Sequence, residues 1–269
     1  MVPIACLSIA GSDSSGGAGI EADVRTFFSL RAQALTAITG LTAQNTLGVR
    51  GLFPTIPAQL AKVLAALGED FQIASVKVGM LPTLGLAQVV AEFLSASNIK
   101  SVVVDPIFAA SSGDFLCSPG EYLEIQKLIF PFADVVTPNF QEAGRILSCQ
   151  EQEIVDGVHD ACEKLAAMGA KAVVMTGGDR RDSPDMSVDY CFMNNKLEAI
   201  SSPRVMSKNT HGTGCTFSSA LSFYLAKGLA LPLAVRASKE HVLMSLRSSV
   251  DYAAGGGRGA SSQWWALRE

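Results

Sequence analysis

The sequence predicts a single α/β domain, a three-layer α/β/α arrangement in which helices cover both faces of a mainly parallel sheet. Short apolar runs alternate with segments of helical apolar periodicity through most of the 269 residues. Polar and glycine-rich segments follow several of the apolar runs, as at the strand ends where open α/β sheets bind ligands. No linker or internal repeat divides the chain. We therefore expect one domain over residues 1–269, with residues 254–269 as a flexible tail.

In order along the chain, the first half predicts strands over 4–10, 35–41, 74–78, 101–104 and 134–137, and helices over 20–31, 57–67, 83–95 and 122–129. The second half predicts a helix that contains Glu142, a helix over 155–168, a helix whose first turn contains Cys215, and a helix over 233–250. It also predicts a strand over 171–175 and a hairpin of 188–193 with 197–200. A loop of small residues over 107–116 has the composition of a segment that closes over a ligand.

The composition favours a cytoplasmic protein that binds small molecules. The net charge is only −4 with dispersed basic residues, so the electrostatic footprint of a nucleic-acid-binding protein is missing. The most apolar late stretch, 220–235, is too short to span a membrane and is interrupted by Lys227 and Pro232. Six cysteines without a CxxC pair fit neither a zinc site nor a secreted disulfide framework. The first residues lack the basic region of a signal peptide, and we expect a reducing, cytoplasmic setting.

A glycine-rich loop over 11–19 follows the first strand. Within it, Gly17, Gly19 and Ala22 have the G-x-G-x-x-A spacing of a dinucleotide fingerprint, which makes a nicotinamide-dependent oxidoreductase the rival hypothesis from another class. The loop is long, however, and no acidic residue follows at the distance that a ribose contact needs. A P-loop is excluded because no Lys-Ser or Lys-Thr closes the run. The glycines are better placed to line a substrate pocket, with Asp13 and Asp23 beside it.

The segment NTHGTGCTFSSAL is the main candidate for chemistry. Gly212, Thr213 and Gly214 mark a loop that turns into a helix, where unpaired amides and the helix dipole attract an anion. Cys215 falls in the first turn, where we expect its pKa to be lowered, so that it serves as a base or nucleophile. Two alternatives are an ordinary helix start with a buried cysteine, and a hydrolase nucleophile with His211 as its base.

A neutral polar cluster that includes Thr42 and Gln44 ends the second predicted strand. An amide donates and accepts hydrogen bonds at once, which suits recognition of a neutral heterocycle.

With these residues assembled, the sequence resembles the hydroxymethylpyrimidine/phosphomethylpyrimidine kinases of thiamine biosynthesis, which belong to the ribokinase-like superfamily. The similarity runs nearly end to end through AGSDSSGGAGIEAD, LTAQNTLGV, KVGML, VVVDP, TPNFQEA and KNTHGTGCTFSSAL. The resemblance implies a ribokinase-like fold, ATP and Mg²⁺, small-molecule acceptors and a homodimer, with phosphorylation of 4-amino-5-hydroxymethyl-2-methylpyrimidine and its monophosphate.

The same resemblance implies roles for particular residues. The turn Gly212, Thr213 and Gly214 would be the anion hole and Cys215 the catalytic base. The pyrimidine would be bound by Gln44, Gly11, Asp23, Thr42 and Met80. The metal would be held by Asp105 and Glu142, and ATP would be bound by Asn139, Thr176, Gly178 and Lys208.

One departure from the family pattern leaves the substrate open. Many members have Lys-Gly-Gly where this chain has Thr176 before its two glycines, so Lys208 is the candidate replacement for the missing cation. A related branch that phosphorylates pyridoxal also tends to have threonine there. Gln44 therefore favours the pyrimidine, and Thr176 keeps a pyridoxal/pyridoxine kinase as the alternative.

Overall fold

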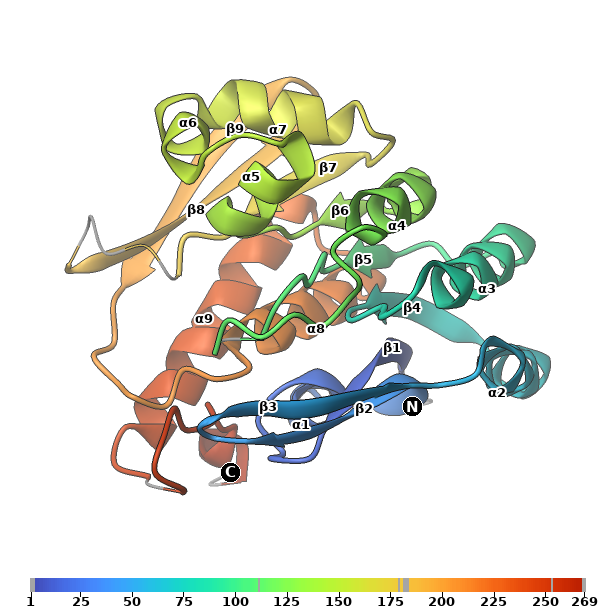
Figure 1. Cartoon of the computed structure of the whole chain (residues 1–269). Helices are drawn as coiled ribbons and strands as arrows, with labels where there is room; N and C mark the ends of the chain where they lie inside the picture. The colour runs from blue at the N-terminus through green and yellow to red at the C-terminus, as the bar shows by residue number, and fades with distance from the viewer. Residues whose placement is uncertain (1–2, 111, 179, 181–183, 253, 268–269) are drawn as a thin grey trace.

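One nine-stranded sheet runs through the molecule (Figure 1), in the order β3-β2-β1-β4-β5-β6-β7-β8-β9. The computed structural model describes residues 3–267 except 111, 179, 181–183 and 253. The strands are β1 (Ala5–Asp13), β2 (Gln33–Asn45), β3 (Gly48–Pro54), β4 (Ile73–Val78), β5 (Val102–Val104), β6 (Val135–Val136), β7 (Ala172–Met175), β8 (Met186–Met193) and β9 (Lys196–Pro203). The central strands pair in parallel, whereas β3, β8 and β9 add antiparallel pairs at the two edges.

Helices cover both faces of this sheet, which confirms the predicted three-layer α/β/α class. They are α1 (Gly19–Ser29), α2 (Pro57–Asp70), α3 (Leu84–Ala96), α4 (Tyr122–Ile129), α5 (Phe140–Leu147), α6 (Glu151–Asp156), α7 (Val158–Ala166), α8 (Thr213–Ala226) and α9 (Leu231–Ser249). In Figure 1, α2 to α7 lie on one face, and α1, α8 and α9 lie on the other. The largest apolar cluster lies between the sheet and the first group, and two smaller clusters hold the second group.

Three predicted elements differ from the structure. The first strand, predicted to end at residue 10, continues to Asp13, so that Gly11 lies within β1. The second strand continues to Asn45 because β3, which was not predicted, pairs with its end as an antiparallel hairpin; Thr42 and Gln44 thus lie within a strand and not after it. The glycines of β3 weaken its strand signal, and its pairing with β2 compensates. The helix predicted over 155–168 is divided at Gly157, which has non-helical φ and ψ of −132° and 48°.

The segment predicted as a flexible tail is packed over much of its described length. Ser261 is 1% exposed and Gln263 is 6% exposed. The backbone N–H of Ser261 donates to the carbonyl of His211, and the amide of Gln263 lies within hydrogen-bond distance of Thr26 and Thr216. A short 3₁₀ helix, Trp264–Leu267, follows. Residues 268–269 of the predicted tail lie outside the described residues.

A buried ion pair joins the sheet to the helices of one face. Lys77 on β4 and Asp23 on α1 are both inaccessible to solvent, and Nζ of Lys77 lies 3.0 and 2.9 Å from the two carboxylate oxygens. Ser8 on β1 and Ser219 on α8 donate hydrogen bonds to the same carboxylate. Four elements therefore meet at one fully buried pair of charges.

We expect Lys77→Met to lower the free energy of unfolding by about 3 to 5 kcal/mol, because it leaves the Asp23 charge buried without its cation. Urea unfolding followed by circular dichroism measures this. The double variant Lys77→Met/Asp23→Leu removes both charges and should recover part of the loss. Lys127→Met, which breaks an exposed pair with Glu124, is the control and should change little. A double variant that is less stable than Lys77→Met would contradict this interpretation.

Candidate active site

The predicted site residues gather in one pocket at the carboxyl ends of the central strands. It is lined by the anion-hole segment, the ring-binding candidates and the metal and nucleotide candidates: Gly212, Thr213, Gly214, Cys215, Gln44, Gly11, Thr42, Met80, Asp105, Asn139, Glu142, Thr176 and Gly178. Asp23 and Lys208 are the two predicted site residues that do not line it. The first part of the loop predicted over 107–116 also borders the pocket, through Ile107, Ala109 and Ala110; residue 111 lies outside the described residues.

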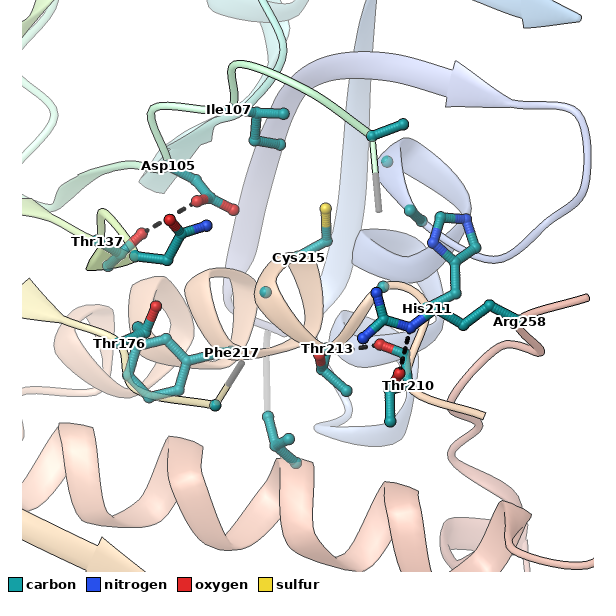
Figure 2. A pocket seen from close by; sticks show the side chains of 18 of the residues that line it. Asp105, Ile107, Thr137, Thr176, Thr210, His211, Thr213, Cys215, Phe217 and Arg258 are labelled. Carbon is teal, nitrogen blue, oxygen red and sulfur yellow. Dashed lines mark hydrogen bonds between the residues drawn. The ribbon is translucent and has the colours of Figure 1, made fainter. Parts of the chain in front are cut away.

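The amino end of α8 forms the floor of the pocket (Figure 2). Gly212 precedes the helix with φ of +81°, and a Cβ there would lie 2.0 Å from the carbonyl oxygen of Gly17. Only glycine fits both constraints. The helix therefore starts at Thr213, with its first-turn amides at the pocket, where they and the helix dipole favour an anion. This is the geometry that the sequence predicts for an anion hole.

Cys215 lies in the first turn of α8 as expected, but its predicted acidity is wrong. Figure 2 shows its sulfur pointing into the pocket, with Asp105 on one side and His211 on the other. Burial raises the pKa of the Cys215 thiol to about 12, although the nearby Lys77 ammonium acts in the opposite direction. Desolvation of the thiolate thus exceeds the stabilisation by the helix end and by Lys77. A pKa this far above neutrality favours the protonated thiol at neutral pH.

Asp13 organises the glycine loop between β1 and α1. Its carboxylate accepts hydrogen bonds from the backbone N–H groups of Ser15, Gly17 and Ala18 and lies 2.7 Å from Nε2 of His211. Burial alone would raise the pKa of Asp13, but the hydrogen bonds from His211 and Ser15 outweigh it and lower the pKa to about 2. The loop N–H groups that would bind a dinucleotide pyrophosphate therefore already donate hydrogen bonds to the Asp13 carboxylate.

The end of the pocket near β2 presents the neutral polar groups predicted for ring recognition. The Gln44 amide lies between the Thr42 hydroxyl, 3.1 Å from Oε1, and the His211 ring, 3.2 Å from Nε2 to Nε2. Met80 covers Gly11 so closely that a Cβ on this glycine would lie 2.2 Å from the Met80 methyl carbon. A planar heterocycle thus has an amide at one edge and an apolar side chain nearby.

The predicted role of Asp23 in ring binding is wrong, because Asp23 does not line the pocket. It faces the interior from α1 and is engaged by Lys77, Ser8 and Ser219. Its effect on a ligand is therefore indirect, through the position of α8 and β4.

Carboxylates mark the opposite end of the pocket. Asp105 follows β5 and accepts hydrogen bonds from Ser218 at 3.0 Å and Thr137 at 3.4 Å. Burial raises the pKa of Asp105, although Lys77 and Ser218 oppose this. Glu142 closes a capping box with Asn139 at the start of α5 and lines the pocket with it. Hard carboxylate oxygens suit Mg²⁺, and a divalent cation would relieve the desolvation of Asp105, so these residues fit that ion.

Thr176 and Gly178 follow β7 on the same side, and cations other than Lys208 accompany them. Arg204 donates to the carbonyl of Gly178 at 2.7 Å, and Nζ of Lys239 lies 2.7 Å from the Asp189 carboxylate. Both cations line the pocket. Lys208 is solvent-exposed and lies outside the lining, so its predicted place as the nucleotide cation is wrong.

Sequence reasoning missed three cations of the pocket: Arg204, Lys239 and Arg258. Arg204 directly follows β9, and Lys239 lies in α9; the apolar pattern of neither segment gives a sign of a ligand. For Arg258 a signal existed, since the arginine stands among the glycines of GGGRG, a setting in which backbone can approach closely.

A family model described as phosphomethylpyrimidine kinase matches residues 13–260. The chain belongs to the phosphomethylpyrimidine kinase family. The family match contradicts the oxidoreductase and hydrolase hypotheses, and the Asp13 carboxylate already accepts hydrogen bonds from the Gly17 and Ala18 amides of the dinucleotide-like loop.

Relatives and solved structures agree with this family and with the ribokinase-like fold. The hydroxymethylpyrimidine/phosphomethylpyrimidine kinase of Escherichia coli is 39% identical over 222 residues, 82% of this chain and 83% of that protein. A probable thiamine biosynthetic bifunctional enzyme of rice, Oryza sativa, is 37% identical and is matched over 93% of this chain and 46% of its own length. The chain thus spans about half the length of the first bifunctional relatives it matches.

Among solved structures, the ADP complex of Bacillus subtilis pyridoxal kinase superposes with a TM-score of 0.88 at 31% identity, covering 99% of both chains. No helix in the described part of the chain combines the length and apolarity required to cross a membrane.

Proposed function

We propose that this protein transfers the γ-phosphoryl group of ATP to the hydroxymethyl group of 4-amino-5-hydroxymethyl-2-methylpyrimidine, and then transfers a second one to the resulting monophosphate. The observation that carries this proposal is the arrangement of one pocket. One pocket contains Gln44, whose amide contacts His211, together with the carboxylates of Asp105 and Glu142. In Figure 2, His211 and Asp105 lie on opposite sides of Cys215, at the amino end of α8. The Escherichia coli relative is named for both phosphorylations.

The chain's own residues position the reactants and stabilise charge, which is most of what phosphoryl transfer requires. The N–H groups of Gly214 and Cys215, in the first turn of α8, would receive the transferred phosphoryl group, whereas the N–H of Thr213 donates to the Thr210 carbonyl. Mg²⁺, when bound, neutralises charge on the ATP phosphates, and Asp105 and Glu142 are the residues that would hold it. Asn139, Thr176 and Gly178 border the nucleotide side, where Arg204 and Lys239 take the place that was expected of Lys208.

The two transfers differ in their need for a base. In the first, the alcohol oxygen attacks the γ-phosphorus, the bond from that phosphorus to the β,γ-bridging oxygen breaks, and the hydroxyl proton must leave. Cys215 is the group we propose to accept it, as a thiolate that becomes populated only as the pH rises toward its raised pKa. In the second, a phosphate oxygen that is already ionised attacks, so no proton has to be removed.

A pyridoxal kinase is the second candidate function. The full-length superposition on the Bacillus subtilis pyridoxal kinase and the threonine at position 176 favour it. Both candidates are tested by incubating the purified protein with ATP, Mg²⁺ and either hydroxymethylpyrimidine, its monophosphate or pyridoxal, and by measuring ADP. Absence of ADP formation with both pyrimidines would overturn the main proposal.

All six cysteines of the chain are free thiols, which supports the reducing cytoplasm as the place of the reaction that we propose.

The first prediction for this reaction concerns ring choice. If Gln44 hydrogen-bonds the pyrimidine, Gln44→Met leaves polar ring atoms unpaired and costs about 1 to 3 kcal/mol in kcat/KM for the pyrimidine. Phosphorylation of pyridoxal should fall less. Gln33→Met, an exposed position on the same strand, is the control. Equal losses for pyrimidine and pyridoxal would mean that Gln44 supports the Thr42 and His211 side chains and does not select the ring.

The second prediction is a pH profile. Because the Cys215 pKa is raised to about 12, the base form grows as the pH rises, and kcat for the alcohol should increase about tenfold per pH unit between pH 6 and 9. The monophosphate reaction should stay nearly constant above about pH 7, since the second pKa of a phosphate monoester is about 6. Cys215→Ala should abolish the slope. A sloping alcohol profile that survives in Cys215→Ala would exclude the thiolate as the base.

The third prediction concerns assembly, and we propose a homodimer formed through the β2-β3 hairpin. β3 is an edge strand, and Leu41 and Phe53, which are 54% and 61% exposed, face each other as cross-strand partners. An apolar patch on a sheet edge favours association. Light scattering at micromolar concentration should give twice the chain mass for the parent and the single mass for Leu41→Lys/Phe53→Glu. A monomeric parent would refute the homodimer.

A further inference from the structure

Arg258 enters the pocket from a glycine-rich segment that is shaped to carry it there. A Cβ at Gly257 would lie 2.0 Å from the carbonyl oxygen of Thr46, and one at Gly259 would lie 1.9 Å from the side-chain oxygen of Asn209. Glycine is required on both sides of the arginine because the backbone lies against these atoms. The glycines of this segment thus serve close packing, which fixes the position of the residue between them.

Hydrogen bonds hold the same backbone on both sides. The N–H of Arg258 donates to the carbonyl of Thr46 at 3.0 Å, and the N–H of Gly257 donates to the Thr46 hydroxyl at 3.1 Å. The N–H of His211 donates to the carbonyl of Gly259 at 3.0 Å. The guanidinium then donates from Nε to the Thr210 hydroxyl at 2.6 Å, beside the amino end of α8 (Figure 2).

The position of Arg258 within the pocket is on the acceptor side. Its backbone anchor, Thr46, is two residues from Gln44, and its neighbour His211 contacts the Gln44 amide. In Figure 2, Arg258 and His211 lie on the opposite side of Cys215 from Asp105, Thr137 and Thr176. Arg204 and Lys239 are held at the other end, by the Gly178 carbonyl and by Asp189. The nucleotide end and the acceptor end therefore have separate cations.

The two proposed acceptors differ in charge by one phosphate group. An alcohol brings no charge to the anion hole, whereas a monophosphate brings up to two negative charges close to the ATP phosphates, which repel it. A guanidinium binds phosphate oxygens through paired N–H groups in a fixed planar geometry. A cation on the acceptor side thus matters for the second transfer much more than for the first.

We propose that Arg258 binds the phosphate of the monophosphate acceptor and so enables the second phosphorylation; this rests on the proposed function. A phosphate oxygen of the acceptor attacks the γ-phosphorus of ATP, and the bond to the β,γ-bridging oxygen breaks. The products are the pyrimidine diphosphate and ADP, with no proton removed from the ionised acceptor. Arg258 stays protonated and holds a non-attacking oxygen of the acceptor phosphate.

The test compares kcat/KM for the alcohol and for the monophosphate at saturating ATP. Arg258→Gln should lower the monophosphate value about 10- to 100-fold, as expected for the loss of a charge-assisted hydrogen bond, with a much smaller loss for the alcohol. Arg258→Lys should restore part of the monophosphate activity. Gly257→Ala keeps the arginine but displaces its backbone, and should also impair the monophosphate reaction selectively. Arg236→Gln, which removes an arginine that is paired with Glu198 outside the pocket, is the control.

Several outcomes would overturn this inference. Equal losses for both acceptors, or a raised KM for ATP in both reactions, would assign Arg258 to the nucleotide. A parent protein that phosphorylates the alcohol but never the monophosphate, or an Arg258→Gln protein with parental activity on both, would leave Arg258 without the proposed role. These results differ from failure of the proposed function, in which the parent phosphorylates neither pyrimidine. Thermal unfolding of each variant checks that the fold is intact.

Discussion

The buried pair of Lys77 and Asp23 is the interaction on which the position of the candidate active site depends. Removing two charges from water costs several kcal/mol for each ion, and only good geometry with further hydrogen bonds compensates for it. Here the Asp23 carboxylate accepts hydrogen bonds from the Lys77 ammonium and from the hydroxyl groups of Ser8 and Ser219. These groups come from β4, α1, β1 and α8, so satisfying them fixes α8 against the strand ends. A shift of α8 would break the hydrogen bond from Ser219 to the buried Asp23 carboxylate and would also move the proposed anion hole.

The same pair contributes to the electrostatics of the pocket. The Lys77 ammonium acts to lower the pKa of Cys215 and of Asp105, yet burial raises both. This balance favours a neutral thiol beside a carboxyl group whose ionised form a divalent cation would stabilise. Asp13 has the opposite balance, because several donors converge on it. The ionised Asp13 carboxylate thus fixes the glycine loop through its hydrogen bonds. The protonation states of Cys215 and Asp105, in contrast, can change when charged ligands bind.

Sequence periodicity was sufficient for the layers of the fold, and the ends of the predicted strands were sufficient to find the pocket. Sequence periodicity did not predict which residues pair with the charged side chains that lie within helices and strands. Asp23 lies on the same face of its helix as Ile20 and Phe27, which indicates burial, but the identity of its cation depends on tertiary packing with β4. The prediction that the pKa of Cys215 is lowered was wrong for a related reason. The position in the first helical turn is a local feature, whereas the desolvation comes from every element packed around α8.

The glycine-rich segment near the chain's end shows why composition alone is ambiguous. Glycine-rich segments can be flexible linkers, but glycine also permits close backbone contacts that no other residue allows. The sequence alone does not distinguish these two uses. In this chain, Gly257 and Gly259 are pressed against Thr46 and Asn209, which lie on the β2-β3 hairpin and before α8. The segment thus joins the proposed ring-binding end of the pocket to the proposed anion hole. Residues that follow the last long helix therefore complete a site whose other parts were formed by strand ends, and their position relative to His211 depends on backbone contacts, which no side-chain pattern records.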